Sequence, residues 1–279
     1  MRLPSPAPEP PRLESPRLES RRVPPDTPLL ATASLTVRYG GVRAVDDVSI
    51  DVPPGSLTGL IGPNGAGKTS LVDALTGLVP YAGQVVLAGT PLDGLPPHAR
   101  CHRGLIRTFQ AVELFDDLDV HGNLVVAASR PTWRQPLADL VRPRRSLALP
   151  AVDRAVEVMG IGHLLHRSPA ELSEGERKLV GLSRALAGSP RVLVLDEPAA
   201  GLDTGESRAL GERLRAIVDA GVAVLLIDHD MELVTAVCDR LYVIEHGAVI
   251  AAGTPWKVLR DERVVAAYLG SATPAGGRR

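Results

Sequence analysis

The residues with the clearest chemical potential form a glycine-rich segment that carries a lysine and two hydroxyl residues. It reads Gly62-Pro63-Asn64-Gly65-Ala66-Gly67-Lys68-Thr69-Ser70 and fits the pattern G-x-x-x-x-G-K-[ST]. Glycines let a backbone wrap closely around phosphate oxygens, and the amide groups at a helix start attract an anion. The Lys68 ammonium can reach the β- and γ-phosphates, and the Thr69 hydroxyl can ligate Mg²⁺. The segment therefore predicts a nucleotide phosphate site.

An acidic pair, Asp196-Glu197, directly follows the apolar run 192–195. An acid at the carboxyl end of a buried parallel strand faces the ligand crevice. We expect Asp196 to hold Mg²⁺ through water and Glu197 to orient and deprotonate the attacking water. His229 follows another apolar run, 222–227. A lone His is more often structural than catalytic, but its position beyond a strand end, on the same side as Asp196, favours a role in the site.

Other candidates carry weaker signals. Gln110 ends an expected strand and could bridge Mg²⁺ and water, although Gln is ordinary at such a position. Tyr39 could stack on a purine or simply lie on a sheet surface. Ser173, with Glu176 three residues later, predicts a capping box at a helix start. The same helix start could instead offer its N–H groups to a phosphate held by another chain.

The elements that must position these residues alternate between strand and helix patterns. This alternation predicts an α/β fold with a P-loop NTPase core, a largely parallel sheet and an antiparallel β edge. We expect a helical subdomain over about 111–185. Expected strands lie near 35–39, 48–52, 57–61, 84–88, 104–109, 192–195, 222–227, 241–245 and 248–252. Expected helices lie near 68–78, 120–129, 152–159, 172–186, 204–220, 233–237 and 254–269, with Thr204 capping its helix and Gly221 ending it.

The two ends and one internal stretch differ from the rest of the chain. Residues 1–29 are rich in proline and repeat the pentapeptide Pro-Arg-Leu-Glu-Ser, which predicts a disordered or polyproline-like tail. A docking peptide is the alternative. We place the globular domain at 30–270 and a flexible tail at 271–279. Residues 130–150 carry four prolines and several arginines, among them Arg134, Arg142, Arg144 and Arg145, and fit a solvated loop or a contact with a membrane partner or anionic lipid.

Composition limits the class of protein. The 279 residues are 44% hydrophobic but only 3% aromatic, so aliphatic side chains must fill the core. The net charge of −1 argues against a general nucleic-acid binder. Cys101 and Cys238 lack metal-ligand spacing, and we expect both to be inert core thiols in a reduced setting. No apolar run approaches the roughly 20 residues of a membrane span. If the protein acts at a membrane, we expect a partner protein to recruit it there.

Together these segments resemble the nucleotide-binding subunit of ABC transporters from about residue 30 to residue 270. The resemblance rests on segments in one order: Tyr39, Gly62 to Thr69, Arg107-Thr108-Phe109-Gln110, Leu172 to Glu176, Val192 to Glu197, Ala200-Gly201-Leu202-Asp203 and His229. It implies an ATPase with catalytic Glu197, His229, Gln110 and Lys68. It also implies ATP contacts from Tyr39, residues 62–70, Ser173, Gly175 and Asp203, and Mg²⁺ near Thr69, Gln110 and Asp196.

The closest likeness is to the ATP-binding subunit of branched-chain amino acid importers. The segments 39–45, 107–110, 196–202, 229–231 and 267–270 are typical of it. It implies a head-to-tail dimer, with itself or a second ATPase, at the cytoplasmic face of the membrane. Transmembrane permease subunits would be direct partners, and an extracytoplasmic solute-binding protein an indirect one. Urea and amide importers share much of the pattern, and a non-transport ATPase of the same family is a further alternative.

This chain departs from the family pattern in three places. Glu176 stands where the signature segment of the family, here Leu172 to Glu176, usually has Gln. The stretch after Ser129 looks short, and the proline-rich tail is extra. The Glu176 charge would be partly occupied if that side chain caps its own helix. If the Glu176 side chain instead faces the nucleotide bound between the two chains of a dimer, the affinity for that nucleotide should fall. None of the three departures removes a catalytic group.

Overall fold

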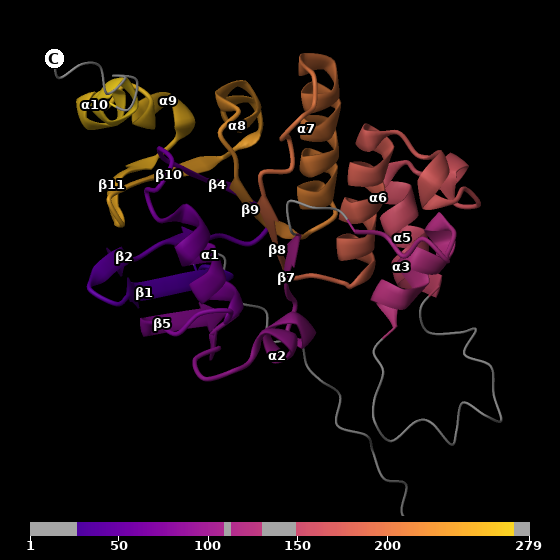
Figure 1. Cartoon of the computed structure of the whole chain (residues 1–279), viewed down its shortest axis with the longest axis horizontal. Helices are drawn as coiled ribbons and strands as arrows, with labels where there is room; N and C mark the ends of the chain where they lie inside the picture. Colours follow the sequence, from indigo (N-terminus) through magenta and orange to yellow (C-terminus); the bar gives the residue numbers. More distant parts are fainter. Residues whose placement is uncertain (1–26, 109–112, 130–148, 271–279) are drawn as a thin grey trace, which may run out of the picture.

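The predicted antiparallel edge is a separate sheet built from the first strands of the chain (Figure 1). The computed structural model describes residues 27–108, 113–129 and 149–270. In this sheet the order is β2-β1-β5-β6, and β3 also pairs with β1. The strands are β1 (Leu30–Tyr39), β2 (Val42–Val48), β3 (Asp51–Val52), β5 (Ala82–Leu87) and β6 (Thr90–Pro91).

A second sheet of six strands carries the predicted site along one edge. Its order is β11-β10-β4-β9-β8-β7, and all neighbours are parallel except β10 and β11. The strands are β4 (Leu57–Ile61), β7 (Leu105–Thr108), β8 (Val192–Asp196), β9 (Ala223–Ile227), β10 (Arg240–Glu245) and β11 (Ala248–Gly253). This order confirms the predicted α/β fold and its largely parallel sheet.

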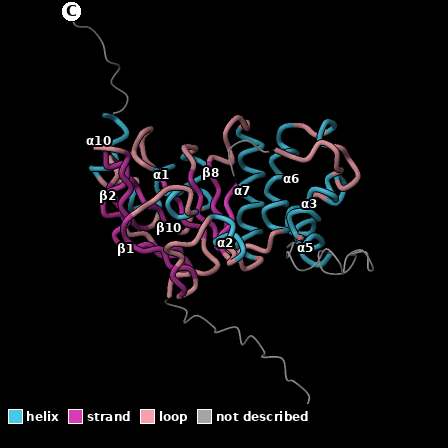
Figure 2. The backbone as a smooth tube through the Cα atoms, turned by 60° about the horizontal axis from the view of Figure 1, so that its bottom comes forward, coloured by secondary structure: helices cyan, strands magenta, loops and turns pink. Residues whose placement is uncertain are grey.

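Helices cover both faces of the six-stranded sheet (Figures 1 and 2). The first ones are α1 (Lys68–Thr76), α2 (Pro97–His102), α3 (Val120–Ala128), α5 (Leu149–Met159) and α6 (Glu174–Ala187). They are followed by α7 (Thr204–Asp219), α8 (Met231–Val237), α9 (Pro255–Val258) and α10 (Glu262–Gly270). Short 3₁₀ turns lie at Gly162–Leu164 and Pro169–Glu171.

Alternation along the buried strands divides the apolar interior into two clusters. In β8, Val192 and Val194 face α1 and the antiparallel sheet, whereas Leu193 and Leu195 face α6 and α7. Successive side chains of a strand point to opposite faces, so a strand buried on both sides must be apolar throughout. The helix that starts at Lys68 is therefore held between the two sheets, while α6 lies on the other face.

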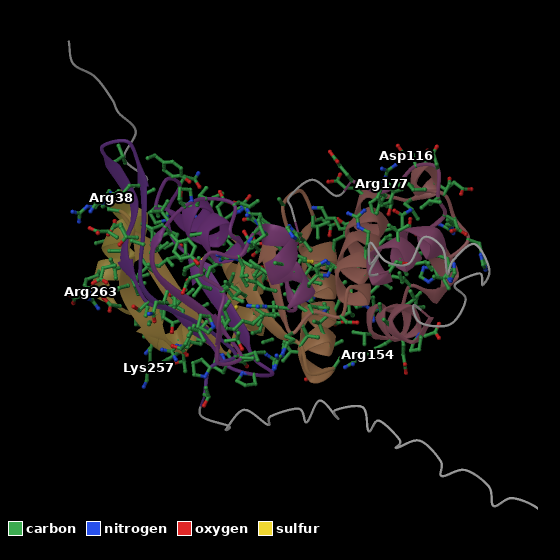
Figure 3. All side chains as sticks on the ribbon, turned by 90° about the horizontal axis from the view of Figure 1, so that it is seen from below. Arg38, Asp116, Arg154, Arg177, Lys257 and Arg263 are labelled. Carbon is green, nitrogen blue, oxygen red and sulfur yellow. The ribbon has the colours of Figure 1, made fainter. Side chains whose placement is uncertain are left out.

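The helices α3, α5 and α6 pack against one another at one end of the molecule (Figures 1 and 2). Charged side chains at this end and at the opposite end, including Arg177, Asp116, Arg38 and Arg263, are directed outward (Figure 3). The helical subdomain boundaries at 111 and 185 stay a prediction. The predicted tails fall largely outside the described residues, as do Gln110 and the stretch 130–148. Within the described part of the chain, every helix is too short or too polar to serve as a membrane span.

Two local predictions are wrong. Asp203, not Thr204, caps α7, because the Asp203 carboxylate accepts a hydrogen bond from the Glu206 N–H and the Glu206 carboxylate accepts one from the Asp203 N–H. Cys238 is buried as expected, but Cys101 is exposed on α2. The short helix α2 turns one face to solvent, and Cys101 lies on that face.

Candidate functional site

The phosphate loop has a conformation that only glycine fits at two positions. Gly62 and Gly67 have φ values of 154° and 104°. A Cβ at Gly62 would lie 2.1 Å from the Ile244 carbonyl oxygen, and a Cβ at Gly67 would lie 2.2 Å from that of Ala44. Helix α1 starts directly after Gly67 and has no side-chain cap. Its first N–H groups are therefore oriented for an anion such as phosphate.

Lys68 is positioned inside this loop. Its ammonium donates hydrogen bonds to the carbonyl oxygens of Gly62, at 2.7 Å, and Pro63, at 3.0 Å. Burial lowers the pKa of Lys68 below its ordinary value, and the negative charges of Glu197 and Asp196 partly oppose that change. The strand-end carboxylates therefore lie close enough to interact with the lysine of the phosphate loop.

The parallel pairing of β8 and β9 brings the acidic pair and the histidine together. Asp196 pairs with Ile227, so the residues after both strands emerge at the same edge. The His229 Nδ1 lies 3.9 Å from Glu197 Oε1. Glu197 has a φ of 49°, uncommon for a residue with a side chain, and its N–H donates to the Ile227 carbonyl. This backbone turn directs the Glu197 side chain from the strand end toward His229.

Asp228, which was not among the residues predicted from the sequence, organises this turn. Its side chain is fully buried and accepts hydrogen bonds from the N–H groups of Ala199, His229 and Asp230. These bonds tie the segment after β8 to the segment after β9. The segment Asp228-His229-Asp230 gave no sign of which acid is buried, because burial depends on the neighbouring strand.

A second missed residue is Arg107, which sequence reasoning used only as part of a motif. Its guanidinium group bridges Asp73 of α1, at 2.5 Å, and Asp196 of β8, at 2.7 Å. The side chain is only 7% exposed. The ion pairs connect the helix of the phosphate loop to the strand that carries the acidic pair.

The residues present fit a hard divalent cation. The Thr69 hydroxyl and the Asp196 carboxylate are oxygen donors, the ligand type that Mg²⁺ prefers. Thr69 is the second residue of α1 and is exposed, and Asp196 is the last residue of β8. Gln110, the third predicted ligand, lies outside the described residues.

The predicted signature segment forms the capping box at the start of α6. The Ser173 hydroxyl accepts from the Glu176 N–H, and the Glu176 carboxylate accepts from the Ser173 N–H. Arg167 lies 3.4 Å from the same carboxylate. Hydrogen bonding with Ser173, aided by the charge of Arg167, lowers the pKa of Glu176. Glu176 is therefore engaged by its own helix start, and Gly175 lies beside the Glu206 carboxylate, which would be 3.1 Å from an added Cβ.

Tyrosines lie at two other places relevant to the site. Tyr39 ends β1 and is 48% exposed, so its ring is accessible to a planar group. Tyr268 of α10 was not predicted as a site residue. Its hydroxyl oxygen accepts a hydrogen bond from the Gly62 N–H, and burial raises the pKa of Tyr268. The C-terminal helix thus reaches the first residue of the phosphate loop.

Comparison with known proteins places this geometry among transport ATPases. The family model described as ABC transporter matches residues 45–200. LivG of Escherichia coli K12, a high-affinity branched-chain amino acid transport ATP-binding protein, is 36% identical over 252 residues, which are 88% of this chain and 99% of LivG. BraF of Pseudomonas aeruginosa, with the same description, is 39% identical over 254 residues, with the same coverage. LptB of E. coli K12, a lipopolysaccharide export system ATP-binding protein, is 38% identical over 245 residues, with 86% and 97% coverage.

Solved structures give the same result. The ATP-binding cassette MJ1267 of an ABC transporter, in its ADP conformation, matches with a TM-score of 0.78 and 32% identity, covering 88% of this chain and 99% of that one. A subunit of the cbiONQ transporter complex, cbiO1 of Clostridium perfringens, matches with a TM-score of 0.73 and 25% identity, covering 88% and 96%. Because the family model covers more than half of the chain and relatives match along almost their whole length, this chain belongs to the ABC transporter family, as an ATP-hydrolysing cassette subunit.

Proposed function

We propose that this chain uses ATP with Mg²⁺ to energise the import of branched-chain amino acids. The observation that carries the proposal is the 36–39% identity to LivG and BraF across 99% of each protein. Similarity to LptB at 38% means that the family alone does not choose the solute.

We assign roles at the site from its geometry. Lys68 and the N–H groups of α1 bind the phosphates, and Glu197 accepts a proton from the attacking water. His229, 3.9 Å from Glu197, orients that water and the γ-phosphate. Thr69 and Asp196 hold Mg²⁺, which neutralises phosphate charge when bound. Tyr39 stacks on the adenine, an assignment that its exposure supports.

We also propose that two cassettes form a head-to-tail dimer. The phosphate loop leads into α1 on one face of the six-stranded sheet, while Ser173 starts α6 on the other (Figure 1). The phosphate loop and the start of α6 of one chain therefore do not meet at the same phosphate. This arrangement supports a dimer in which the second chain supplies the start of α6. In that dimer Ser173, Gly175 and Asp203 would face the partner's ATP. The Glu176–Arg167 pair keeps the extra negative charge compensated.

A groove of about 790 Å³ supports direct contact with a permease at the cytoplasmic face of the membrane. It lies between β7 and the helices α3 and α6. Ile106, Phe115, Val126 and Leu182 line its apolar part, and it extends to Asp196 and Glu197 of the site. Phe115 and Val126 are 51% and 45% exposed, and exposed apolar side chains in a groove favour a protein contact. We propose that a short apolar segment of the permease occupies this groove, and that a solute-binding protein acts indirectly through the permease.

The experiment is recovery of tagged Glu197→Gln protein from its native membranes with ATP present, followed by mass spectrometry and a leucine-uptake assay. Two polytopic permeases, and leucine uptake that the variant abolishes, are expected. Recovery of membrane proteins without any effect on leucine, isoleucine or valine uptake would contradict the solute assignment.

Similarity to LptB makes an export ATPase the second candidate. In that case the same purification would recover permeases, but the variant would leave amino acid uptake unchanged and impair export of lipopolysaccharide. Recovery of ribosomal or DNA-repair proteins without a permease would contradict both transport functions.

A further inference from the structure

A buried arginine connects the expected metal-binding acid to the helix of the phosphate loop. Arg107 lies on β7, where it pairs in register with Val194 of β8. One guanidinium nitrogen lies 2.7 Å from Asp196 Oδ2 and another lies 2.5 Å from Asp73 Oδ1. The Asp73 and Asp196 side chains are 24% and 15% exposed, so neither charge is fully solvated. Charge pairs in such surroundings interact more strongly than they do in bulk water.

The site must hold phosphates close to acidic side chains. Asp196 and Glu197 both lie near Lys68, as their influence on the lysine shows. A nucleoside triphosphate entering without a metal would meet these carboxylates, and like charges repel at short range. Arg107 adds a positive charge at the Asp196 end of this arrangement. Its removal would leave Asp73 and Asp196 with one cation fewer between them.

We propose that Arg107 is a positioning residue that sets how strongly nucleotide binding depends on Mg²⁺. It compensates the charge of Asp196, so that phosphates are tolerated before the metal arrives, and it fixes the carboxylate through Oδ2. The inference rests on the Mg²⁺ site of the proposed function. It goes further, because it gives a non-ligand residue control over the metal dependence of binding.

A purely structural role predicts a different result. If Arg107 only tied β7 to α1, loss of Asp73 would have the same effect as loss of Arg107. In our account Asp73→Asn keeps the Arg107–Asp196 pair and changes stability alone, whereas Arg107→Gln removes charge compensation at Asp196. Arg107→Lys retains the charge but loses the planar fork that bridges both acids. Arg103→Gln is the matched control, since it removes an exposed arginine whose guanidinium donates to the Pro91 carbonyl, away from both acids.

The test measures the affinity of a fluorescent ATP analogue for the full-length chain, with excess Mg²⁺ and with EDTA, beside the unfolding temperature. For Arg107→Gln we expect about a tenfold loss of affinity in EDTA and a smaller loss with Mg²⁺, so that the ratio of the two affinities rises. Arg107→Lys, Asp73→Asn and Arg103→Gln should keep the wild-type ratio within about twofold. If Arg107→Gln unfolds, Arg107→Lys still tests the inference. It keeps the positive charge, so a changed ratio of the affinities in Mg²⁺ and EDTA would contradict the role of that charge.

Two results overturn the inference in different ways. An unchanged ratio in Arg107→Gln, or an equal change in Asp73→Asn, refutes the role of Arg107 and leaves the metal site intact. If wild-type affinity is the same in Mg²⁺ and EDTA, the proposed metal site fails, and the inference fails with it.

Discussion

Substitution of Gly62 by alanine tests whether the phosphate loop depends on the backbone conformation described above. Gly62 has a φ of 154° and faces the carbonyl oxygen of Ile244 on the neighbouring strand β10. The added Cβ would lie 2.1 Å from that oxygen, whereas real Cβ atoms essentially never approach within 3.0 Å. The shortfall between these distances requires the backbone to move by about 0.9 Å.

The expected magnitude follows from this displacement. A side chain at an unfavourable φ costs about 1–3 kcal/mol, and the clash with a paired strand adds to it. We expect a loss of about 3 kcal/mol, or roughly 6–12 °C in unfolding temperature for a domain of this size. Because Lys68 bonds to the Gly62 carbonyl, the displacement also moves the lysine. A misplacement of about 1 Å near reacting groups can lower a rate roughly 100-fold.

The assay combines thermal unfolding, nucleotide affinity and ATP turnover, with Gly55→Ala as the matched control. Gly55 has a φ of 60°, and a Cβ there would meet no atom within 4 Å. The control should lose about 1 kcal/mol, or roughly 2–4 °C, and keep its turnover. If Gly62→Ala unfolds at the same temperature as the control and retains ATP turnover, the close-approach argument is refuted.

Three further predictions concern Lys68, Tyr268 and Cys238. Lys68→Met should weaken ATP binding roughly 10–100-fold in a titration. It should shift the unfolding temperature without nucleotide by only about 3 °C or less, because the Lys68 ammonium is desolvated in the folded chain and its loss removes that cost. A much larger shift in unfolding temperature would contradict this. Tyr268→Phe leaves the Gly62 N–H without its acceptor and should cost about 1–3 kcal/mol in thermal unfolding, and unchanged stability would show that the bond is dispensable. Burial raises the pKa of the Cys238 thiol to about 12, so alkylation at pH 8 should modify Cys101 and spare Cys238 until the chain unfolds. The unfolded thiol ionises near its ordinary pKa of 9.0 while the folded one stays protonated, so this group's contribution to stability is lost as pH rises from about 9 to 12. Cys238→Ser should abolish this loss when unfolding is measured as a function of pH.

The fold could be predicted because local patterns and global packing agree in this chain. The run 192–195 is apolar at every position, and β8 is buried on both faces. The parallel sheet then explains why residues distant in sequence, Glu197 and His229, meet at one edge. The capping box of Ser173 and Glu176 was also readable, because it depends on three-residue spacing alone.

The remainder depends on contacts between distant segments. Arg107 binds Asp73 and Asp196 only because β7 lies beside β8 and near α1, an arrangement that no local pattern specifies. Tyr268 reaches Gly62 because the C-terminal helix returns to the sheet. The difference between Cys101 and Cys238 likewise reflects which face of each element is covered.

Steady-state ATP hydrolysis by Glu197→Gln, measured with the partners that the full-length chain recovers, tests the central claim most directly. Glu212→Gln is the matched control, because Glu212 is an exposed carboxylate on α7 with no assigned role. We expect Glu197→Gln to bind ATP as tightly as wild type but to hydrolyse it roughly 100–10,000-fold more slowly, while the control is unaffected. Turnover by Glu197→Gln within about threefold of wild type, at equal ATP affinity, would contradict the assignment of the base and the geometry of the site built around it.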